Sequence, residues 1–194
     1  EVISRRYLMT AGRPIEAVQR GLQEIKDEIS PDFKVRGVAT TGSGRYMIGE
    51  LAGADIIRNE ITAQAKGGSH FVPDVDTIFE IGGQDSKYIS MENGVVVDFE
   101  MNRACAAGTG SFLEEQAERL GINIKNDFAE MAFRAEMPVS AGERCTVFME
   151  SDMMRFEQGG ASREEITAGL SFAIVHNYIN KVVGRKKIGN KILF

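Results

Sequence analysis

Residues 75–101 constrain the fold more than any other stretch of this chain. The apolar run VDTIFEIGG has the character of a strand that ends in two glycines, and SKYISMENGVVVDFEM follows as two β-rich runs. Asn93-Gly94 separates these runs and is the strongest short signal for a hairpin turn. We therefore predict a strand followed at once by an antiparallel hairpin.

Helix-like segments lie on both sides of this region. Apolar residues at helical spacing, together with capping residues, predict helices at Pro14 to about Ile29, Tyr46–Ala52, about Asn59–Lys66, Ser111–Leu120, Asp127–Ala135, Val147–Gln158 and Ser162–Val183. Further strands are expected at Val2–Met9, at KVRGVAT and at KILF. Strands that alternate with helices, with one hairpin between them, favour an α/β fold with a mixed sheet. We expect residues 1 to about 100 to form mostly the α/β sheet part, and residues from about 101 to 190 to form a mostly helical part that carries both cysteines.

Composition limits the classes of function. The net charge of −5 argues against general nucleic-acid binding. No apolar run approaches the ~18 residues of a membrane span. Two cysteines and no visible signal peptide indicate a reducing, cytoplasmic setting. Both ends of the chain read as strand, so we expect a fragment that is incomplete at both ends.

The glycines at the end of the VDTIFEIGG strand are candidates for a phosphate-binding loop. Without a Cβ, a glycine backbone can approach a ligand closely, and exposed N–H groups can cradle phosphate oxygens. Neighbouring acids can hold Mg²⁺ or orient an attacking water. The alternative is a simple tight turn, because neither a Walker A loop nor a GxGxxG motif is present. The candidate residues are Glu80, Gly82, Gly83, Gln84, Asp85 and Lys87. A second glycine turn, TTGSGR at 40–45, either lines the same cleft or is an ordinary βα loop.

Both cysteines precede helix-like segments. Cys105 lies before a helix capped by Thr109 or Ser111, where Ser111 and Glu114 fit a capping box, and Cys145 lies before a second helix. The positive end of a helix lowers the pKa of a nearby thiol, although free cysteines are often simply buried. A cubane cluster needs four thiolates and a structural zinc also needs four ligands. His70 and His176 lack ligand spacing, so a complete site would take Cys105 and Cys145 from each of two chains.

Two other patterns have simpler explanations. Met149, Met153 and Phe156 form a helical stripe that is typical of a core. Lys181, Arg185, Lys186, Lys187 and Lys191 form a basic cluster, which is either a solvated face or a docking patch for an acidic partner.

Three segments resemble a known family. FEIGGQDSKYI, DFEMNRACAAGTGSFLEEQAERLG and CTVFMESDMM are similar to the activator ATPases of 2-hydroxyacyl-CoA dehydratases and benzoyl-CoA reductases. RYLMTAGRPIEAVQRGL and the segment from Gly160 to Gly189 look like the large fused CoA-substrate-specific enzyme activases. The similarity covers nearly the whole chain.

This resemblance implies an actin-like, ribonuclease-H-like ATPase fold with a mixed sheet and flanking helices. It implies ATP or ADP with Mg²⁺ at Gly82, Gly83, Gln84 and Asp85, and a homodimer with one [4Fe–4S] cluster held by Cys105 and Cys145 of each chain. Gln84 or Asp85 would position the attacking water, and Glu80 or Asp85 the Mg²⁺. Nucleotide hydrolysis would change the helix angle at the cluster and send one electron from ferredoxin or flavodoxin to a partner dehydratase or reductase.

The chain departs from the full family pattern in three ways. The first phosphate loop would lie before Glu1, the adenosine-binding glycines would follow Phe194, and Glu80 stands where smaller members usually have Asp. Two alternatives of other classes therefore stay open. One is a non-catalytic interaction module, a diverged repeat of a fused activase; the other is a small-molecule kinase of the same fold.

Overall fold

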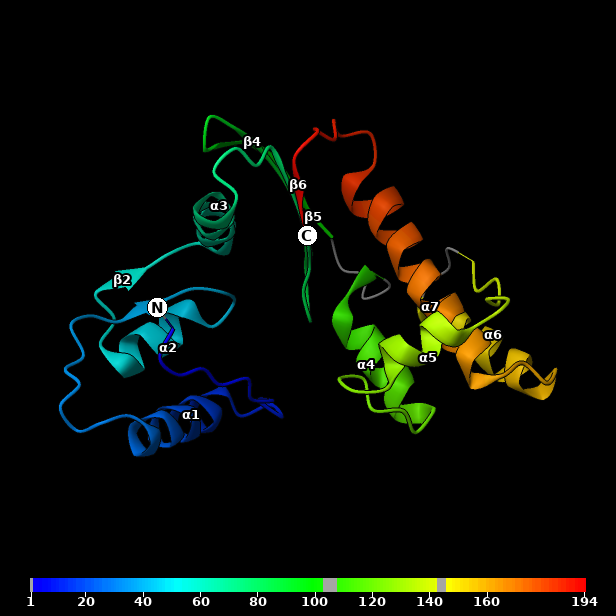
Figure 1. The fold of residues 1–194 in the computed structure, drawn as a ribbon, viewed down its shortest axis with the longest axis horizontal. Coiled ribbons are helices and arrows are strands. Elements are labelled where there is room, and N and C mark those ends of the chain that lie inside the picture. Colours follow the sequence, from blue (N-terminus) through cyan, green and yellow to red (C-terminus); the bar gives the residue numbers. More distant parts are fainter. Residues whose placement is uncertain (1, 103–107, 143–145) are drawn as a thin grey trace. The chain divides into compact units, whose positions relative to one another are not determined.

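The computed structural model describes residues 2–102, 108–142 and 146–194 (Figure 1). Contacts within the chain divide it into two compact units, Glu1–Gly67 and Gly68–Phe194. This division falls inside a helix, α3 (Glu60–Phe71), which is longer than the helix expected at Asn59–Lys66.

The first unit contains a small parallel sheet and helices. Its elements are α1 (Pro14–Glu28), β1 (Ala39–Thr40), α2 (Arg45–Ala52), β2 (Ile56–Ile57) and the start of α3. Strands β1 and β2 pair in parallel. The predicted α1 and α2 are confirmed, and Pro14 occupies the first turn of α1, where its missing N–H is not needed. Of the run KVRGVAT, only Ala39 and Thr40 are in a strand, because only these two residues pair with β2.

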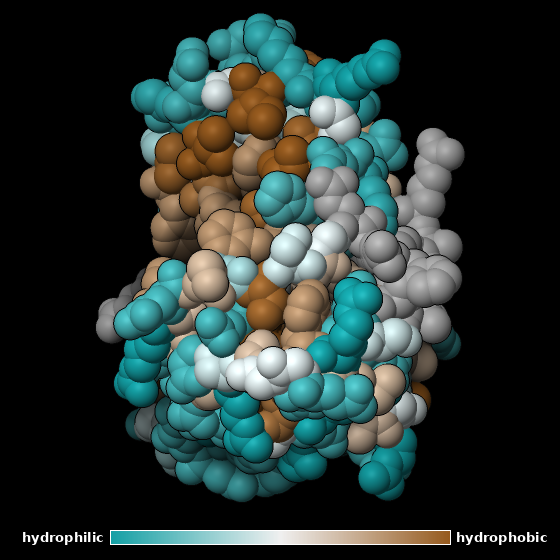
Figure 2. Space-filling view, turned by 90° about the vertical axis from the view of Figure 1, so that its right-hand side faces the viewer, coloured by the Kyte–Doolittle hydropathy of each residue, from teal (hydrophilic) through white to brown (hydrophobic). Residues whose placement is uncertain are grey.

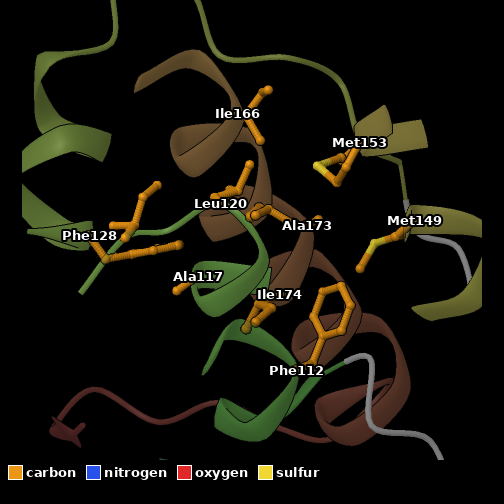
Figure 3. Packing of buried hydrophobic residues seen from close by; sticks show 12 residues of the cluster. Phe112, Ala117, Leu120, Phe128, Met149, Met153, Ile166, Ala173 and Ile174 are labelled. Atoms are coloured by element: carbon orange, nitrogen blue, oxygen red, sulfur yellow. The ribbon is translucent and has the colours of Figure 1, made fainter. Parts of the chain in front are cut away.

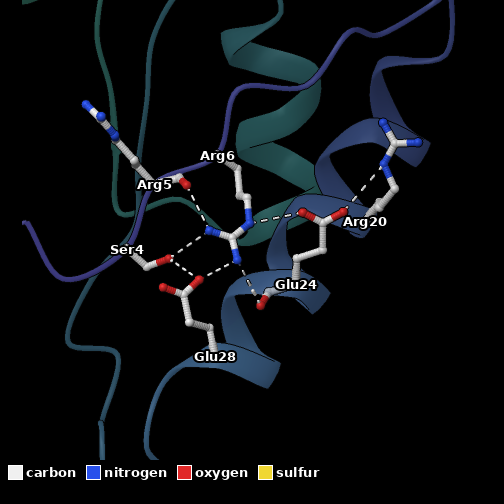
Figure 4. A network of polar contacts seen from close by, with 6 residues as sticks. All are labelled: Ser4, Arg5, Arg6, Arg20, Glu24 and Glu28. Atoms are coloured by element: carbon white, nitrogen blue, oxygen red, sulfur yellow. Dashed lines mark hydrogen bonds and ion pairs between the residues drawn. The ribbon is translucent and has the colours of Figure 1, made fainter.

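The strand predicted at Val2–Met9 is wrong, since these residues are not in a strand. Instead, the Arg6 side chain ties this segment to α1 (Figure 4). Its Nε lies 3.0 Å from the Glu24 carboxylate, and its Nη2 contacts Glu28. This contact lowers the pKa of the Glu28 carboxyl group below its usual value and raises the pKa of Arg6. An apolar pattern alone does not make a strand where no neighbouring strand supplies backbone partners.

The second unit is built on a four-stranded mixed sheet. The strands are β3 (Thr77–Ile81), β4 (Ser86–Glu92), β5 (Val95–Met101) and β6 (Ile192–Leu193), in the order β5-β4-β3-β6. Strands β3, β4 and β5 are antiparallel neighbours, whereas β6 runs parallel to β3. Asn93 and Gly94 have positive φ angles of 52° and 77°, as a type I′ hairpin turn requires. The hairpin and the mixed sheet are confirmed.

Helices occupy most of the rest of this unit. They are α4 (Gly110–Arg119), α5 (Phe128–Arg134), α6 (Thr146–Gln158), α7 (Arg163–Tyr178) and a π-helical turn, η2 (Ile179–Val183). The predicted capping box at the start of α7 is present, with Ser162 and Glu165 each bonded to the backbone of the other. The helix expected to run to Val183 changes to π geometry after Tyr178, and the Gly184 N–H closes it on the Ile179 carbonyl at 2.7 Å.

The main core lies between these helices (Figure 3). Phe112 of α4, Met149 and Met153 of α6, and Ile166 of α7 are each at most 4% exposed. Phe156 packs against the same cluster from its edge. The Met149, Met153 and Phe156 stripe is therefore a core stripe, as its spacing predicts.

A second cluster fixes the end of α7 to the sheet. Tyr178, Val182 and Val183 pack with Tyr88 of β4 and with Phe79 of β3. The Tyr178 hydroxyl donates to the Lys87 carbonyl at 2.7 Å, and burial raises the pKa of this phenol well above its usual value. These contacts hold the start of β4 near Lys87 in one position relative to α7.

The surface of this unit carries both apolar and charged areas. Figure 2 shows apolar atoms gathered on the side where α6 and α7 lie in Figure 1. Exposed apolar residues of these helices include Met154, Phe172 and Val175. No helix among the described residues is both long enough and apolar enough to span a bilayer.

Part of the predicted basic cluster is neutralised within the fold. The Lys186 ammonium lies 2.9 Å from the Asp98 carboxylate and 3.8 Å from that of Glu100, and Lys191 contacts Asp74. At least two of the five charges of the cluster therefore have acidic partners on the protein's own surface, which favours a solvated face over a docking patch.

Replacing Gly169 by alanine is expected to lower the free energy of unfolding by about 1–3 kcal/mol. An added Cβ would lie 2.5 Å from both the carbonyl oxygen and a methyl carbon of Val139. The Val139 N–H also donates to the Glu165 carbonyl at 3.1 Å, so this backbone cannot easily move away from α7. Denaturant unfolding of the variant measures the loss.

Gly67 provides the matched control, because it also lies within a helix but has no atom within 4 Å of an added Cβ. Gly67→Ala should raise the free energy of unfolding by about 0.5–1 kcal/mol, since alanine is the better helix former. A Gly169→Ala protein as stable as Gly67→Ala would contradict the predicted close contact.

Candidate nucleotide-binding loop

A short loop follows β3 at the predicted glycines. The Gly82 N–H donates to the Asp85 carbonyl at 2.9 Å, which closes the loop on itself. Gly82 and Asp85 are half-buried, whereas Gly83 and Gln84 are exposed at its tip. An added Cβ at Gly82 would lie 2.6 Å from Glu80 Oε1 and 2.7 Å from the Asp85 carbonyl oxygen. Gly82 is thus required by the loop's own geometry, and Gly83 and Gln84 are its accessible part.

Two of the predicted site residues form an ion pair beside this loop. Glu80 and Lys87 are directly opposite each other on β3 and β4, and Lys87 Nζ lies 3.0 Å from Glu80 Oε2. Lys87 is only 6% exposed, so a neutralising partner is needed to keep its charge inside the protein. The roles of Glu80 in holding Mg²⁺ and of Lys87 in binding nucleotide remain predictions, and any ion bound by Glu80 would share its carboxylate with Lys87.

The start of α4 is hydrogen-bonded to the same loop. The Gly110 N–H donates to the Gly82 carbonyl at 2.8 Å, and the Ser111 N–H donates to the Gly83 carbonyl at 3.0 Å. The Ser111 hydroxyl also donates to the Gly83 carbonyl. The capping box predicted for Ser111 and Glu114 is therefore wrong. Thr109 is the N-cap residue, and the Ser111 hydroxyl is bonded to the loop instead.

Ser86, which the sequence did not single out, joins the two ends of the segment that carries Cys105. Its N–H donates to Asn102 Oδ1 at 2.7 Å, and its hydroxyl donates to the Gly108 carbonyl. Ser86 is fully buried and directly follows Asp85. Both ends of that segment are therefore fixed next to the glycine loop. Only the position of this serine immediately after the loop could have indicated the role.

The cysteines predicted as metal ligands, Cys105 and Cys145, lie outside the described residues. The helices that follow them, α4 and α6, are neighbours, since Phe112 and Met149 belong to one core cluster. Arg119 of α4 also pairs with Glu150 of α6. Within the described parts of the chain, no group of three or more His, Asp or Glu side chains could hold a metal ion.

The second glycine turn lies in the first unit and connects β1 to α2. Its ends are tied locally, because Thr40 Oγ1 donates to the Arg45 carbonyl at 2.8 Å and Arg45 Nη1 donates to the Gly42 carbonyl at 2.9 Å. This is the geometry of a βα loop. That the turn lines a nucleotide cleft remains a prediction.

Comparison with known proteins gives a consistent result along the whole chain. The model of the BadF/BadG/BcrA/BcrD ATPase family matches residues 2–194. The (R)-2-hydroxyglutaryl-CoA dehydratase activating ATPase of Acidaminococcus fermentans is 32% identical over 180 residues, which are 92% of this chain and 68% of that protein. The 2-hydroxyisocaproyl-CoA dehydratase activator of Clostridioides difficile is 32% identical over 156 residues, 80% of this chain and 56% of that protein.

Solved structures agree with this result. The crystal structure of the Acidaminococcus fermentans (R)-2-hydroxyglutaryl-CoA dehydratase component A superposes with a TM-score of 0.79 at 31% identity, covering 96% of this chain and 69% of that one. The 2-hydroxyisocaproyl-CoA dehydratase activator from Clostridium difficile, solved with bound ADPNP, gives 0.80 at 28% identity, covering 99% and 68%. The predicted actin-like α/β fold is confirmed.

Proposed function

Because this chain belongs to the BadF/BadG/BcrA/BcrD ATPase family, we propose that it forms part of an ATP-dependent activator of a 2-hydroxyacyl-CoA dehydratase or a related reductase. The observation that carries the proposal is the glycine loop after β3. Its tip is exposed, and its carbonyl groups accept hydrogen bonds from the first residues of α4. Such a loop is suited to the phosphates of a nucleotide. The names of the relatives supply the class of partner enzyme.

In this proposal the N–H groups of Gly83 and Gln84 donate to phosphate oxygens. The Gln84 amide or the Asp85 carboxylate would orient the attacking water, and Asp85 or Glu80 would hold Mg²⁺. Water then forms a new bond to the γ-phosphorus while the bond between that phosphorus and the β,γ-bridging oxygen breaks, so that ADP leaves with that oxygen and the proton released by the water passes to a phosphate oxygen or to solvent. When bound, Mg²⁺ would supply positive charge where charge develops on the phosphate oxygens, and Lys87 would add to it, less the part that Glu80 neutralises.

We also propose that Cys105 and Cys145 hold a [4Fe–4S] cluster between two copies of the chain. The donor set fits, because each chain has two cysteines and a cubane cluster takes four thiolates. The neighbouring positions of α4 and α6 support a common site for the two cysteine segments. When bound, the cluster would supply a one-electron carrier that receives its electron from ferredoxin or flavodoxin. Exposed Phe172 and Val175 offer apolar area that a homodimer could bury.

The test uses the complete protein with its natural termini, purified without oxygen. We expect MgATP hydrolysis, and activation of a 2-hydroxyacyl-CoA dehydratase only when ATP and a one-electron reductant are both present. Absence of nucleotide binding by calorimetry would contradict the proposal and favour a non-catalytic module. Phosphorylation of a sugar by protein that binds no iron would instead favour a kinase.

A further inference from the structure

The glycine loop presents its carbonyl groups to α4. The carbonyl of Gly82 accepts from the Gly110 N–H at 2.8 Å, and that of Gly83 accepts both the Ser111 N–H at 3.0 Å and the Ser111 hydroxyl. Two consecutive peptide units therefore have their oxygen atoms fixed on the α4 side.

Covalent geometry then determines where the N–H groups of these units point. In a trans peptide the carbonyl and the following N–H point in opposite directions, and the described residues contain no cis peptide bond. The N–H groups of Gly83 and Gln84 consequently point away from α4. Neither N–H donates to any group in the described part of the chain. The loop thus has a protein-facing side of acceptors and an open side of two free donors.

The contact with the loop also supplies hydrogen-bond acceptors to the first N–H groups of α4. The first N–H groups of a helix have no partner within the helix, and the N-cap residue Thr109 makes no side-chain cap bond here. The loop carbonyls take the place of a capping side chain. Gly110 permits this approach, since an added Cβ would lie 3.3 Å from the Gly82 oxygen.

We propose that Ser111 is a positioning residue for nucleotide binding: its hydroxyl fixes the Gly83 carbonyl and so directs the Gly83 and Gln84 N–H groups toward phosphate. This inference rests on the proposed nucleotide role of the loop.

The same hydrogen bonds also let a bound nucleotide act on α4. A phosphate that accepts from these N–H groups polarises both peptide units, which strengthens the hydrogen bonds that their carbonyls accept from Gly110 and Ser111. Nucleotide binding therefore stabilises the first turn of α4, and the two effects are thermodynamically reciprocal.

The experiment compares variants of the complete protein by calorimetric titration with MgADP and with a non-hydrolysable ATP analogue. Ser111→Ala should weaken binding about three- to tenfold, the range expected for one lost hydrogen bond. Ser111→Thr keeps the hydroxyl and should restore most of the affinity. Ser171→Ala is the matched control, because Ser171 Oγ donates to the Thr167 carbonyl at 2.9 Å within α7, away from the loop. It should bind nucleotide as the wild type does.

Hydrogen exchange provides a readout that a merely structural role would not change. MgADP should slow exchange of the Gly110 and Ser111 amides in the wild type, and do so less in Ser111→Ala. Wild-type affinity in Ser111→Ala, with nucleotide bound normally, would overturn the inference and leave the proposed function intact. A wild-type protein that binds no nucleotide would overturn both. If Ser111→Ala does not fold, hydrogen exchange in the wild-type protein tests the inference by itself. Unchanged exchange at Gly110 and Ser111 on MgADP binding would then overturn it.

Discussion

Gly82→Ala is expected to distort the nucleotide loop and to reduce the affinity for MgADP by about tenfold or more. The added Cβ would lie 2.7 Å from the Asp85 carbonyl oxygen, which is also the acceptor for the Gly82 N–H. The loop can relieve this clash only by opening, at a cost of about 1–3 kcal/mol for an overpacked site. Opening also withdraws the Gly82 carbonyl from Gly110, so α4 loses one of its caps. We expect a lower melting temperature of the ligand-free protein as well as weaker binding.

A variant of the neighbouring Gly83 distinguishes an effect on stability from an effect on nucleotide binding. An added Cβ there meets only Ser111 Oγ, at an ordinary distance of 3.7 Å. Gly83→Ala should therefore melt at the wild-type temperature without ligand, while its methyl group, on the exposed tip, obstructs phosphate and weakens binding. Equal melting temperatures for Gly82→Ala and the wild type would contradict the clash. Wild-type MgADP affinity in Gly83→Ala would remove Gly83 from the site.

Local chemistry explains which elements the sequence could predict. The Asn93-Gly94 turn needs two residues that tolerate positive φ, and the start of α7 needs only Ser162 and Glu165 to satisfy each other. Both requirements are met by residues a few positions apart. Such features can be found by inspection, because no distant part of the chain has to be in place.

The wrong predictions concern residues whose conformation depends on a hydrogen-bond or ion-pair partner far away in the sequence. Ser111 has the local pattern of a capping box, but the Gly83 carbonyl, 28 positions earlier, accepts its hydroxyl hydrogen bond. Val2–Met9 has the composition of a strand, but Arg6 is held by Glu24 and Glu28 of α1. From the sequence, Gly82 and Gly83 could both be predicted as residues of a phosphate-binding loop. Only the structure assigns one glycine to the closure of the loop and the other to its accessible tip.

Replacing Cys105 by serine is expected to remove all iron from the anaerobically reconstituted complete protein. In the proposed site the four thiolates come from Cys105 and Cys145 of both copies, so one substitution removes two of the four ligands. A serine hydroxyl remains protonated at neutral pH and is a poor substitute for a thiolate. Cys145→Ser should have the same effect, since the two residues contribute equally.

Iron and sulfide analysis with measurement of mass in solution distinguishes the possible sites. A bridging [4Fe–4S] cluster gives four irons for every two chains, whereas a [2Fe–2S] cluster gives half as much iron and a structural zinc gives none. Because the cluster joins the chains, its removal by a chelator should also weaken the dimer, and the serine variants should match the chelated wild type in mass. Ser171→Ala, which leaves both cysteines in place, should retain full iron content. A Cys105→Ser protein with four irons per dimer would exclude Cys105 as a ligand, and with it any site that needs equal contributions from both cysteines.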